Sequence, residues 1–575
     1  MFKKAENGLN RSKLRFGVLL LFMLFSYYED AQAQILNADF PVLEQYLRRQ
    51  QLLGEFPLHQ SFTLRPIRFD GRDSTGATNT VSEILTGISK IENPQKRINI
   101  LPLISTTEIN TKRPYGWGNK GLIPNVGIQT YLSVGVYARF KFLEIQFQPE
   151  FSYSQNKPFD GFEAQFSGFE NYSRYFYWNN GDNPERFGNE SIHRFWWGQS
   201  SVNILMGPMA LGVSTQNIWW GPGQFNSLIF SDNSEGFPHL SLSTRRPLKT
   251  VVGNFEMQVI MGRLEDSGLF PSQNEVLNRR YFRRFDGDWR YLNGLKINYN
   301  PSFLKNFFLG FSRTFHQYSK YMGDSFKDYF PVFEVFQKKT LFENGNSITY
   351  DGRGQDQQVS LSMRYVVPKA NFEIYAEYGR RDHAYNWRDF ILNPDHARAY
   401  LFGFQKLFPI PERNSFLQVR GEMTQQQESV NRYVRYPGLI GNQTWNTHGL
   451  ARAFGNYGEN LGVGIGVGSN VQTLEITEVK GMMKRGILLE RLENNQDYFF
   501  RAFGQNPEKK PWVDLSFGLL WDQRFDRLVL SGKAQFVKAH NYQWQSKGIS
   551  TDDYPNGRKV FSFYGNLNII YQLKK

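Results

Sequence analysis

The chain has 575 residues, 16% aromatic residues, no cysteine and a formal net charge of +14. The lack of cysteine excludes disulfide bonds, thiol catalysis and thiolate metal sites. Mean hydropathy is −0.51, and no segment after the N-terminal leader contains 18 consecutive apolar residues, which excludes helical membrane spans.

The first 33 residues have the composition of a secretory signal peptide. A basic start containing Lys3 and Arg15 precedes an apolar run from Phe16 to Phe25, and Ala31-Gln32-Ala33 places small residues where a signal peptidase cuts. Because the apolar run has about half of the roughly 20 residues that a bilayer helix needs, we expect cleavage near Ala33 rather than an anchor. Cleavage removes five basic and three acidic residues, so the charge falls from +14 to +12.

Residues 34–120 are predicted to form an N-terminal helical, periplasmic segment. Asp39 is a candidate cap for a first helix, with Pro41 in the first turn and Gly54 at the end. A second helix is predicted over 81–91, where capping-box spacing precedes an apolar stripe. We expect both helices to pack against the periplasmic end of the domain that follows.

Residues 121–575 are predicted to form an all-β domain, because their side chains alternate with period two. In 143–154, Leu143, Ile145, Phe147, Phe151 and Tyr153 share one face, and the other face is polar or charged. A soluble sandwich would also fit two such strands, but many of them in an exported chain favour a transmembrane antiparallel β-barrel with lipid outside and water inside. The 448 residues from 128 onward, at roughly 25 per strand with its connection, allow about 18 strands, so 16 or 18 are expected.

One passage is too unusual for ordinary strand sequence. Asn217-Ile218-Trp219-Trp220-Gly221-Pro222-Gly223 is followed by Ser227-Leu228-Ile229 and by Phe237-Pro238-His239-Leu240-Ser241-Leu242, and its Gly-Pro-Gly imposes a turn. The passage resembles the Wzi family of capsule-assembly outer-membrane proteins. The segments 61–67, 114–119 and 148–150 are similar to other parts of that family, and the resemblance covers residues 35 to 575.

The resemblance implies an 18-stranded outer-membrane barrel with a periplasmic helical part. It also implies a lectin-like role, in which the protein holds capsular or exopolysaccharide at the cell surface without catalysis. The helical region is shorter and more broken than a three-helix bundle, so the sequence leaves open whether it plugs the barrel.

Sugar recognition needs flat aromatic faces for pyranose C–H groups, and charged or hydrogen-bonding groups for hydroxyls and carboxylates. The candidate polysaccharide-binding residues are Trp196, Trp197, Trp219, Trp220, Arg245, Arg246, Arg279, Arg280, Arg283 and Arg284. The tryptophans would equally suit an interfacial aromatic girdle. Arg245 and Arg246 would suit a turn that binds lipid headgroups, and the 279–284 cluster a solvated loop.

The sequence contains no catalytic or metal-binding motif. The eight histidines lack metal-ligand spacing, no Gly-x-Ser-x-Gly element occurs, and we expect no enzyme activity, no cofactor and no metal. The basic charge predicts anionic partners, namely acidic surface polysaccharide and the phosphates of lipopolysaccharide, and export argues against nucleic acid. A passive sugar-permeable channel and an outer-membrane enzyme remain the alternative functions.

Overall fold

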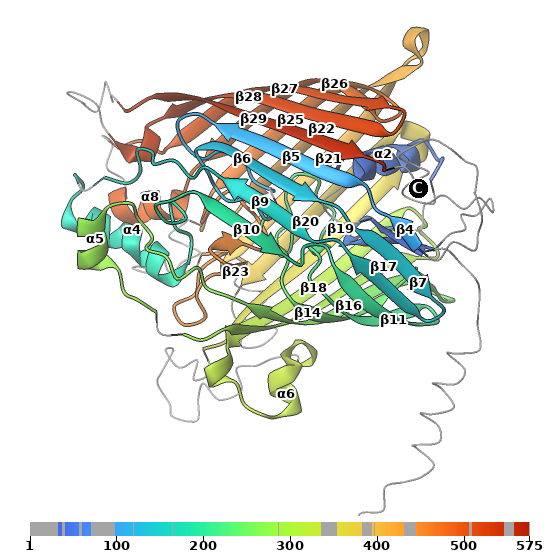
Figure 1. Ribbon diagram of the computed structural model, residues 1–575, viewed down its shortest axis with the longest axis horizontal. Coiled ribbons are helices and arrows are strands. Elements are labelled where there is room, and N and C mark those ends of the chain that lie inside the picture. The colour runs from blue at the N-terminus through green and yellow to red at the C-terminus, as the bar shows by residue number, and fades with distance from the viewer. Residues whose placement is uncertain are drawn as a thin grey trace, which may run out of the picture.

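The protein is an antiparallel β-barrel. The computed structural model describes residues 33–36, 41–56, 60–70, 98–118, 120–163, 165–285, 287–334, 354–381, 391, 394–395, 397–429, 444–504, 509–545 and 557–573. Within them the sheet closes on itself through the pairing of β29 (Val560–Tyr571) with β5 (Leu103–Asn110), as Figure 1 shows. No helix in this part of the chain is long and apolar enough to cross a membrane.

The barrel wall has 18 strands in the described residues. The ring contains 23 segments, but ten of them form five interrupted strands: β4–β5, β6–β7, β8–β9, β10–β11 and β14–β15. The two segments of each such strand pair with one and the same neighbouring strand, which is in some cases itself interrupted. The predicted antiparallel barrel is confirmed. The wall segments are β4 (Ile98–Ile100), β5, β6 (Gly127–Ser133), β7 (Val136–Phe140), β8 (Leu143–Phe147), β9 (Glu150–Ser154), β10 (Ile192–Trp196), β11 (Ser201–Met206), β12 (Met209–Ser214), β14 (His239–Thr244), β15 (Leu248–Lys249), β16 (Gly253–Leu264), β17 (Arg290–Pro301), β18 (Phe307–Tyr318), β19 (Asp356–Val367), β20 (Phe372–Arg381), β21 (Arg398–Ile410), β22 (Ser415–Gln425), β25 (Asn470–Lys480), β26 (Met483–Glu493), β27 (Val513–Phe525), β28 (Leu528–His540) and β29.

In the part of the chain that the structure describes, helices and three small sheets are separate from the wall segments. The α-helices are α2 (Pro41–Leu52), α4 (Gly168–Asn180), α5 (Glu275–Tyr281), α6 (Phe326–Tyr329) and α8 (Gln496–Phe503). The small sheets pair β1 (Ala33–Leu36) with β3 (Ile67–Asp70), β2 (Leu64–Arg65) with β13 (Trp219–Trp220), and β23 (Gly455–Asn456) with β24 (Glu459–Asn460). Short 3₁₀ helices cover Ser319–Tyr321, Pro331–Phe333, Pro368–Ala370, Pro411–Arg413 and Tyr542–Trp544.

The wall is apolar outside and polar inside, as the alternation predicts. In β8 and β9, Phe147 and Phe151 point outward and remain 43% and 41% exposed. Glu144 and Glu150 point into the lumen and are buried there. Each strand thus presents one face to lipid and one to the lumen.

The two ends of the barrel differ. Short turns, such as those at 141–142, 481–482 and 526–527, join consecutive strands at one end, which we call the short-turn end. Long connections join them at the other end, the long-loop end, where α4, α5 and α8 lie in Figure 1, whereas α2 lies at the short-turn end. Outer-membrane barrels have short periplasmic turns and longer extracellular loops, so the long-loop end faces outside the cell.

The barrel begins earlier in the chain than residue 121. Its first wall segments, β4 and β5, lie within 98–110, inside the segment predicted to be helical and periplasmic. Alternation is hard to see there because small polar residues such as Ser105 and Thr107 occupy the outward positions of β5. The first predicted helix is confirmed as α2, whereas the second, over 81–91, and residues 1–32 of the signal peptide lie outside the described residues.

Candidate functional site

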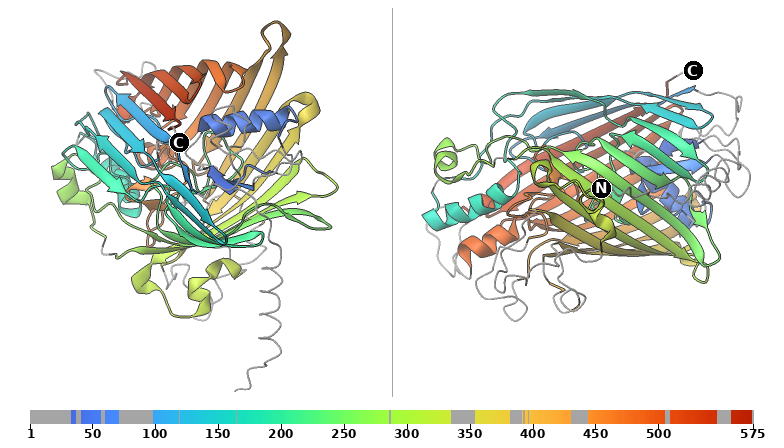
Figure 2. Two further views of the ribbon diagram at one scale, coloured as in Figure 1. Left: turned by 45° about the vertical axis from the view of Figure 1, so that its right-hand side comes forward. Right: turned by 90° about the horizontal axis from the view of Figure 1, so that it is seen from below.

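The lumen contains the N-terminal segment and the long connection between β12 and β14. The backbones of β13 and β2 pair there, Trp219 with Arg65 and Trp220 with Leu64. Trp220 is fully buried, and its indole N–H donates to Gln258 Oε1 of the wall at 2.8 Å. The Trp-Gly-Pro-Gly element is therefore part of a plug inside the barrel, and in Figure 2 α2 sits in the mouth of the short-turn end.

The Gly-Pro-Gly turn is held by one wall carboxylate, that of Glu422 on β22. It accepts hydrogen bonds from the backbone N–H groups of Gln224 at 2.7 Å and Asn226 at 2.8 Å, from that of Phe225 at 3.2 Å, and from the Tyr375 hydroxyl at 2.9 Å. Gly221 has a φ of +144°, and a Cβ there would lie 2.7 Å from Glu377 Oε2. The turn thus needs glycine at this position and an acceptor at the wall.

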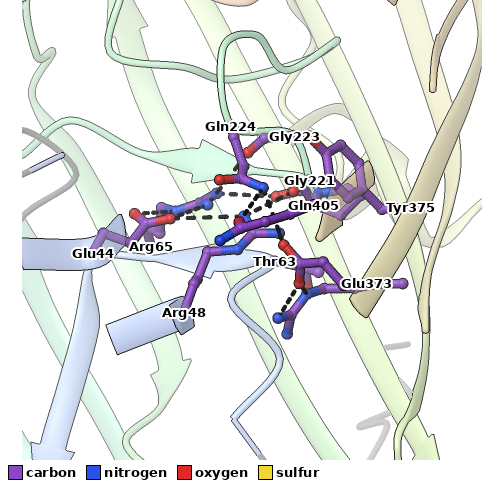
Figure 3. Close-up of polar contacts among 12 residues, drawn as sticks. Glu44, Arg48, Thr63, Arg65, Gly221, Gly223, Gln224, Glu373, Tyr375 and Gln405 are labelled. Atoms are coloured by element: carbon purple, nitrogen blue, oxygen red, sulfur yellow. Dashed lines mark hydrogen bonds and ion pairs between the residues drawn. The ribbon is translucent and has the colours of Figure 1, made fainter. Parts of the chain in front are cut away.

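A buried ion cluster ties α2 to the same turn and to the wall (Figure 3). Arg48 of α2 donates to Pro222 O at 3.0 Å and to Glu373 Oε1 of β20 at 2.9 Å. Arg364 of β19 donates to the other oxygen of the Glu373 carboxylate at 2.8 Å. All three side chains are fully buried, so removal of one partner would leave an uncompensated charge inside the barrel.

Arg65 makes a second link across the plug. Its guanidinium donates to Glu44 Oε2 of α2 at 2.6 Å and to Gly221 O at 3.0 Å, and lies 4.8 Å from the centre of the Trp219 ring. The α2 helix, the 60–66 segment and the Gly-Pro-Gly turn therefore form one connected body in the lumen. These contacts identify a structural role for the most distinctive passage of the sequence.

A cavity of about 240 Å³ remains between this plug and the wall. Its lining includes six acidic and five basic side chains together with aromatic rings: Glu44, Glu108, Asp232, Glu475, Glu490 and Asp522; Arg65, Lys120, Arg420, Lys484 and Lys533; and Tyr115, Trp117, Tyr131, Trp219, Phe225 and Tyr564. Its rings and charges suit a small polar molecule.

At the long-loop end, α4 and α5 pack together through polar contacts. The α4 helix starts at a capping box in which Ser167 and Glu170 exchange hydrogen bonds. Tyr175 OH donates to Asn278 Oδ1 at 2.7 Å, and Asn179 both donates to Tyr281 O at 3.1 Å and accepts from the backbone N–H of Arg283 at 3.0 Å. These bonds fix α5 and the residues after it on the side of α4.

The resulting surface carries both kinds of group that sugar recognition needs. Arg279, Arg280, Arg283 and Arg284 are exposed, and Phe169 and Tyr172 of α4 are 59% and 45% exposed. We call these six residues the outer basic face. Charged and aromatic groups on an exposed surface can contact several units of a long polymer at once.

Buried charges support the outer basic face from below. Glu185 Oε1 accepts from the backbone N–H of Phe162 at 2.8 Å, and burial raises the pKa of this carboxyl, while the Arg174 guanidinium opposes the shift. Burial lowers the pKa of Arg174, whose guanidinium lies 4.3 Å from the centre of the Trp178 ring. Packing between these loops therefore depends on groups kept away from water.

The structure separates the predicted binding residues into five places. Trp219 and Trp220 are buried in the plug, and neither offers a free ring face at the surface. Trp196 is partly buried and packs inside the wall near Gly121, whereas Trp197 is 67% exposed on the outer face of the wall, with its ring centre 6.1 Å from that of Phe147.

The arginines divide between the two ends. Arg245 and Arg246 lie in the connection between β14 and β15 at the short-turn end, where Arg245 donates to Gly207 O at 2.8 Å. Arg279, Arg280, Arg283 and Arg284 lie together on the outer basic face, in and after α5. The ten residues thus do not form one site.

The sequence did not single out the residues that hold the plug, Arg48, Arg65, Glu373 and Glu422. Alternation places Glu373 and Glu422 on the polar face of their strands. It carries no information on their partners, since Arg48 and Glu373 are 325 residues apart in the chain. Among the described residues, no group of histidine, aspartate and glutamate side chains could hold a metal ion.

Comparison with known proteins identifies similar chains. A model of the Wzi capsule assembly protein family matches residues 119–477. No curated protein sequence matches this chain. Among solved structures, the chain is similar to Wzi of Escherichia coli, which is described as an outer-membrane protein involved in group 1 capsule assembly and as a carbohydrate-binding β-barrel. The two chains are 12% identical, the match covers 95% of this chain and 100% of that chain, and the TM-score is 0.57. More distant matches are OprB of Pseudomonas putida (9% identity, 84% and 96% covered, TM-score 0.32) and OccAB1 of Acinetobacter baumannii (8% identity, 83% and 97% covered, TM-score 0.39).

Proposed function

Because the chain belongs to the Wzi family of capsule assembly proteins, we propose that it binds capsular or exopolysaccharide and helps to assemble or retain that polymer at the cell surface. The protein is an outer-membrane β-barrel. The observation that carries the proposal is the family match, which runs from the loop before β6 to β25 and so includes both the wall and the Gly-Pro-Gly turn of the plug.

The outer basic face is the proposed binding site. A polymer needs an open surface at the long-loop end, and the four arginines at 279, 280, 283 and 284 are exposed there. Arginine binds carboxylates with two parallel hydrogen bonds, so this face favours an acidic polysaccharide. Exposed Phe169 and Tyr172, which belong to the same face, supply apolar ring surfaces for sugar rings.

The plug argues against a wide passive channel. The α2 helix and the segment around Trp220 are fixed inside the lumen by buried ion pairs and hydrogen bonds. We therefore propose a binding protein without transport or catalysis as its main role. Planar-bilayer recording tests this directly, because large and stable conductance would favour a channel.

Binding of the host's own surface polysaccharide to purified protein tests the site. Replacement of Arg279, Arg280, Arg283 and Arg284 by glutamine is expected to weaken binding about tenfold or more, since tenfold corresponds to about 1.4 kcal/mol and four charge-assisted contacts are lost. The loss should be larger at low salt, where exposed charges are less screened.

A matched variant controls for net charge. Arg246, Lys249, Lys305 and Lys369 are exposed at the short-turn end, so their replacement by glutamine removes the same charge from the opposite end of the barrel. We expect this variant to bind like the unaltered protein. Equal weakening in both variants, or no weakening in the first, would contradict the assignment of the site.

A further inference from the structure

A part of the connection between β18 and β19 folds back over the outside of the barrel. It contains α6 and the 3₁₀ helix Pro331–Phe333, and we call residues 325–334 the outer flap. Figures 1 and 2 both show α6 outside the wall rather than over the mouth of the barrel.

Packing identifies the side of the wall that the flap covers. Val332 of the flap forms a buried cluster with Leu295 of β17 and Phe315 of β18. The alternate positions of β17 face the lumen, since a Cβ on Gly294 would lie 2.9 Å from the Trp220 ring of the plug. Leu295 and its neighbours therefore face outward, and the flap lies on the face that the rest of the wall turns to lipid.

The outer face of the wall changes from apolar to polar underneath the flap. Toward the short-turn end, Ile297 and Phe311 are paired, and Phe311 pairs with Leu361, so this row is wholly apolar. The next row pairs Leu295 with Arg313. An arginine on the lipid face costs about 2–4 kcal/mol at the midplane but close to nothing near the interface, so we expect the step from the apolar row to Arg313 to lie near the outer border of the hydrocarbon.

The flap backbone and one neighbouring side chain of the wall satisfy these outward polar groups. Arg313 Nη1 donates to Val332 O at 3.2 Å and also to Glu334 O, and its guanidinium donates to Gln357 Oε1 at 2.7 Å. Tyr291 OH donates to Tyr329 O at 2.5 Å. Such internal pairing is what a segment beside lipid requires, because acyl chains offer no hydrogen-bond partners.

The other side of the flap is aromatic and exposed. Phe326, Phe333 and Tyr329 are 68%, 55% and 39% exposed, and the rings of Phe326 and Phe330 stack with centres 4.9 Å apart. Lys327, an exposed lysine of the flap, pairs with Glu334 at 3.4 Å, which reduces the charge of this surface. Aromatic side chains are enriched where membrane proteins cross from acyl chains to headgroups.

We propose that the outer flap is a membrane-interface element, with Phe326 and Phe333 inserted among the lipids of the outer leaflet beside β17 and β18. The flap continues the lipid-facing wall at the height where Arg313 would otherwise meet the membrane border. Its contact with lipid is independent of polysaccharide binding, which rests on the outer basic face.

Spin labelling provides the test, because the chain has no cysteine and a single introduced cysteine is unique. Phe333→Cys and, separately, Phe326→Cys are labelled with a nitroxide in vesicles of phosphatidylcholine and phosphatidylglycerol. Leu361→Cys, 48% exposed on the outer wall, is the lipid reference, and Val276→Cys, 63% exposed on α5, is the water reference. Native folding of each variant is checked by its heat-modifiable migration in gels.

Accessibility to dissolved oxygen and to a water-soluble nickel chelate reports the surroundings of each label. We expect labels at 333 and 326 to favour oxygen as the label at 361 does. Two results would overturn the proposal: labels that favour nickel as the label at 276 does, which would place the flap in water, or labels shielded from both reagents with dipolar broadening, which would mean that a second copy covers it.

Discussion

Replacement of Glu422 by glutamine should loosen the Gly-Pro-Gly turn inside the barrel. The carboxylate accepts from four donors, with Gln224 N–H and Tyr375 OH on one oxygen, Asn226 N–H on the other, and Phe225 N–H at 3.2 Å from both. A glutamine keeps one oxygen and puts an NH₂ group in place of the other. At least one backbone donor then loses its partner and meets a second donor.

The size of the effect follows from these contacts. A hydrogen bond to a charged group is worth about 1.5–3 kcal/mol, and loss of the bond to Asn226 together with weakening of that to Phe225 should cost about 2–3 kcal/mol. Since each 1.4 kcal/mol changes an equilibrium constant tenfold, the equilibrium constant for local opening of the turn should rise about 30- to 150-fold.

Hydrogen exchange measured by mass spectrometry over residues 221–228 would report this opening in detergent-solubilised protein. Glu478→Gln is the matched control, because that carboxylate lies near the short-turn end and bonds to the exposed side chains of Arg413 and Arg485. We expect no change over 221–228 in the control. Unchanged exchange in a natively folded Glu422→Gln variant would refute the inference that this carboxylate holds the turn.

Two further predictions concern the plug and the outer loops. Trp220→Ala removes a fully buried indole and should lower the free energy of unfolding by about 3–5 kcal/mol. The melting temperature should fall accordingly, and an unchanged melting temperature would contradict the packing of Trp220 in the plug. Burial raises the pKa of Glu185 above its ordinary 4.5, so packing of α4 is most stable below that value and weakens as pH rises through the raised pKa. In the Glu185→Gln variant, the rate of hydrogen exchange over 168–180, corrected for intrinsic exchange, should depend less on pH than in the unaltered protein. If the pH dependence persists in the variant, another group causes it.

Much of the fold could be predicted because it depends on local patterns. Alternation in 143–154 specifies which face of β8 and β9 meets lipid, and the first α2 turn is marked by Pro41 and its end by Gly54. The first wall strand was missed because Ser105 and Thr107 interrupt the apolar residues Leu103 and Ile109 on its outer face. The outer flap was missed because its aromatic residues resemble an ordinary loop until they are seen against Arg313.

The candidate site was predicted only in part. The cluster at 279–284 is local in sequence: Arg279 and Arg280 lie in α5, and Arg283 and Arg284 follow it directly. Trp219 and Trp220 are adjacent to a Gly-Pro-Gly turn that fits a surface loop and a luminal plug equally well. The plug is identified only by contacts with distant parts of the chain, namely with the Glu422 carboxylate of the wall and with the backbone of β2.

By itself the sequence determined an exported, cysteine-free antiparallel barrel with one apolar and one polar face on each strand, because a period of two is a property of the extended backbone. The tertiary structure decided what fills the lumen, which end carries each group of arginines and which loop lies against the membrane. Those outcomes depend on pairs such as Arg48 with Glu373 and Arg313 with Val332 O, whose members meet only after the barrel closes.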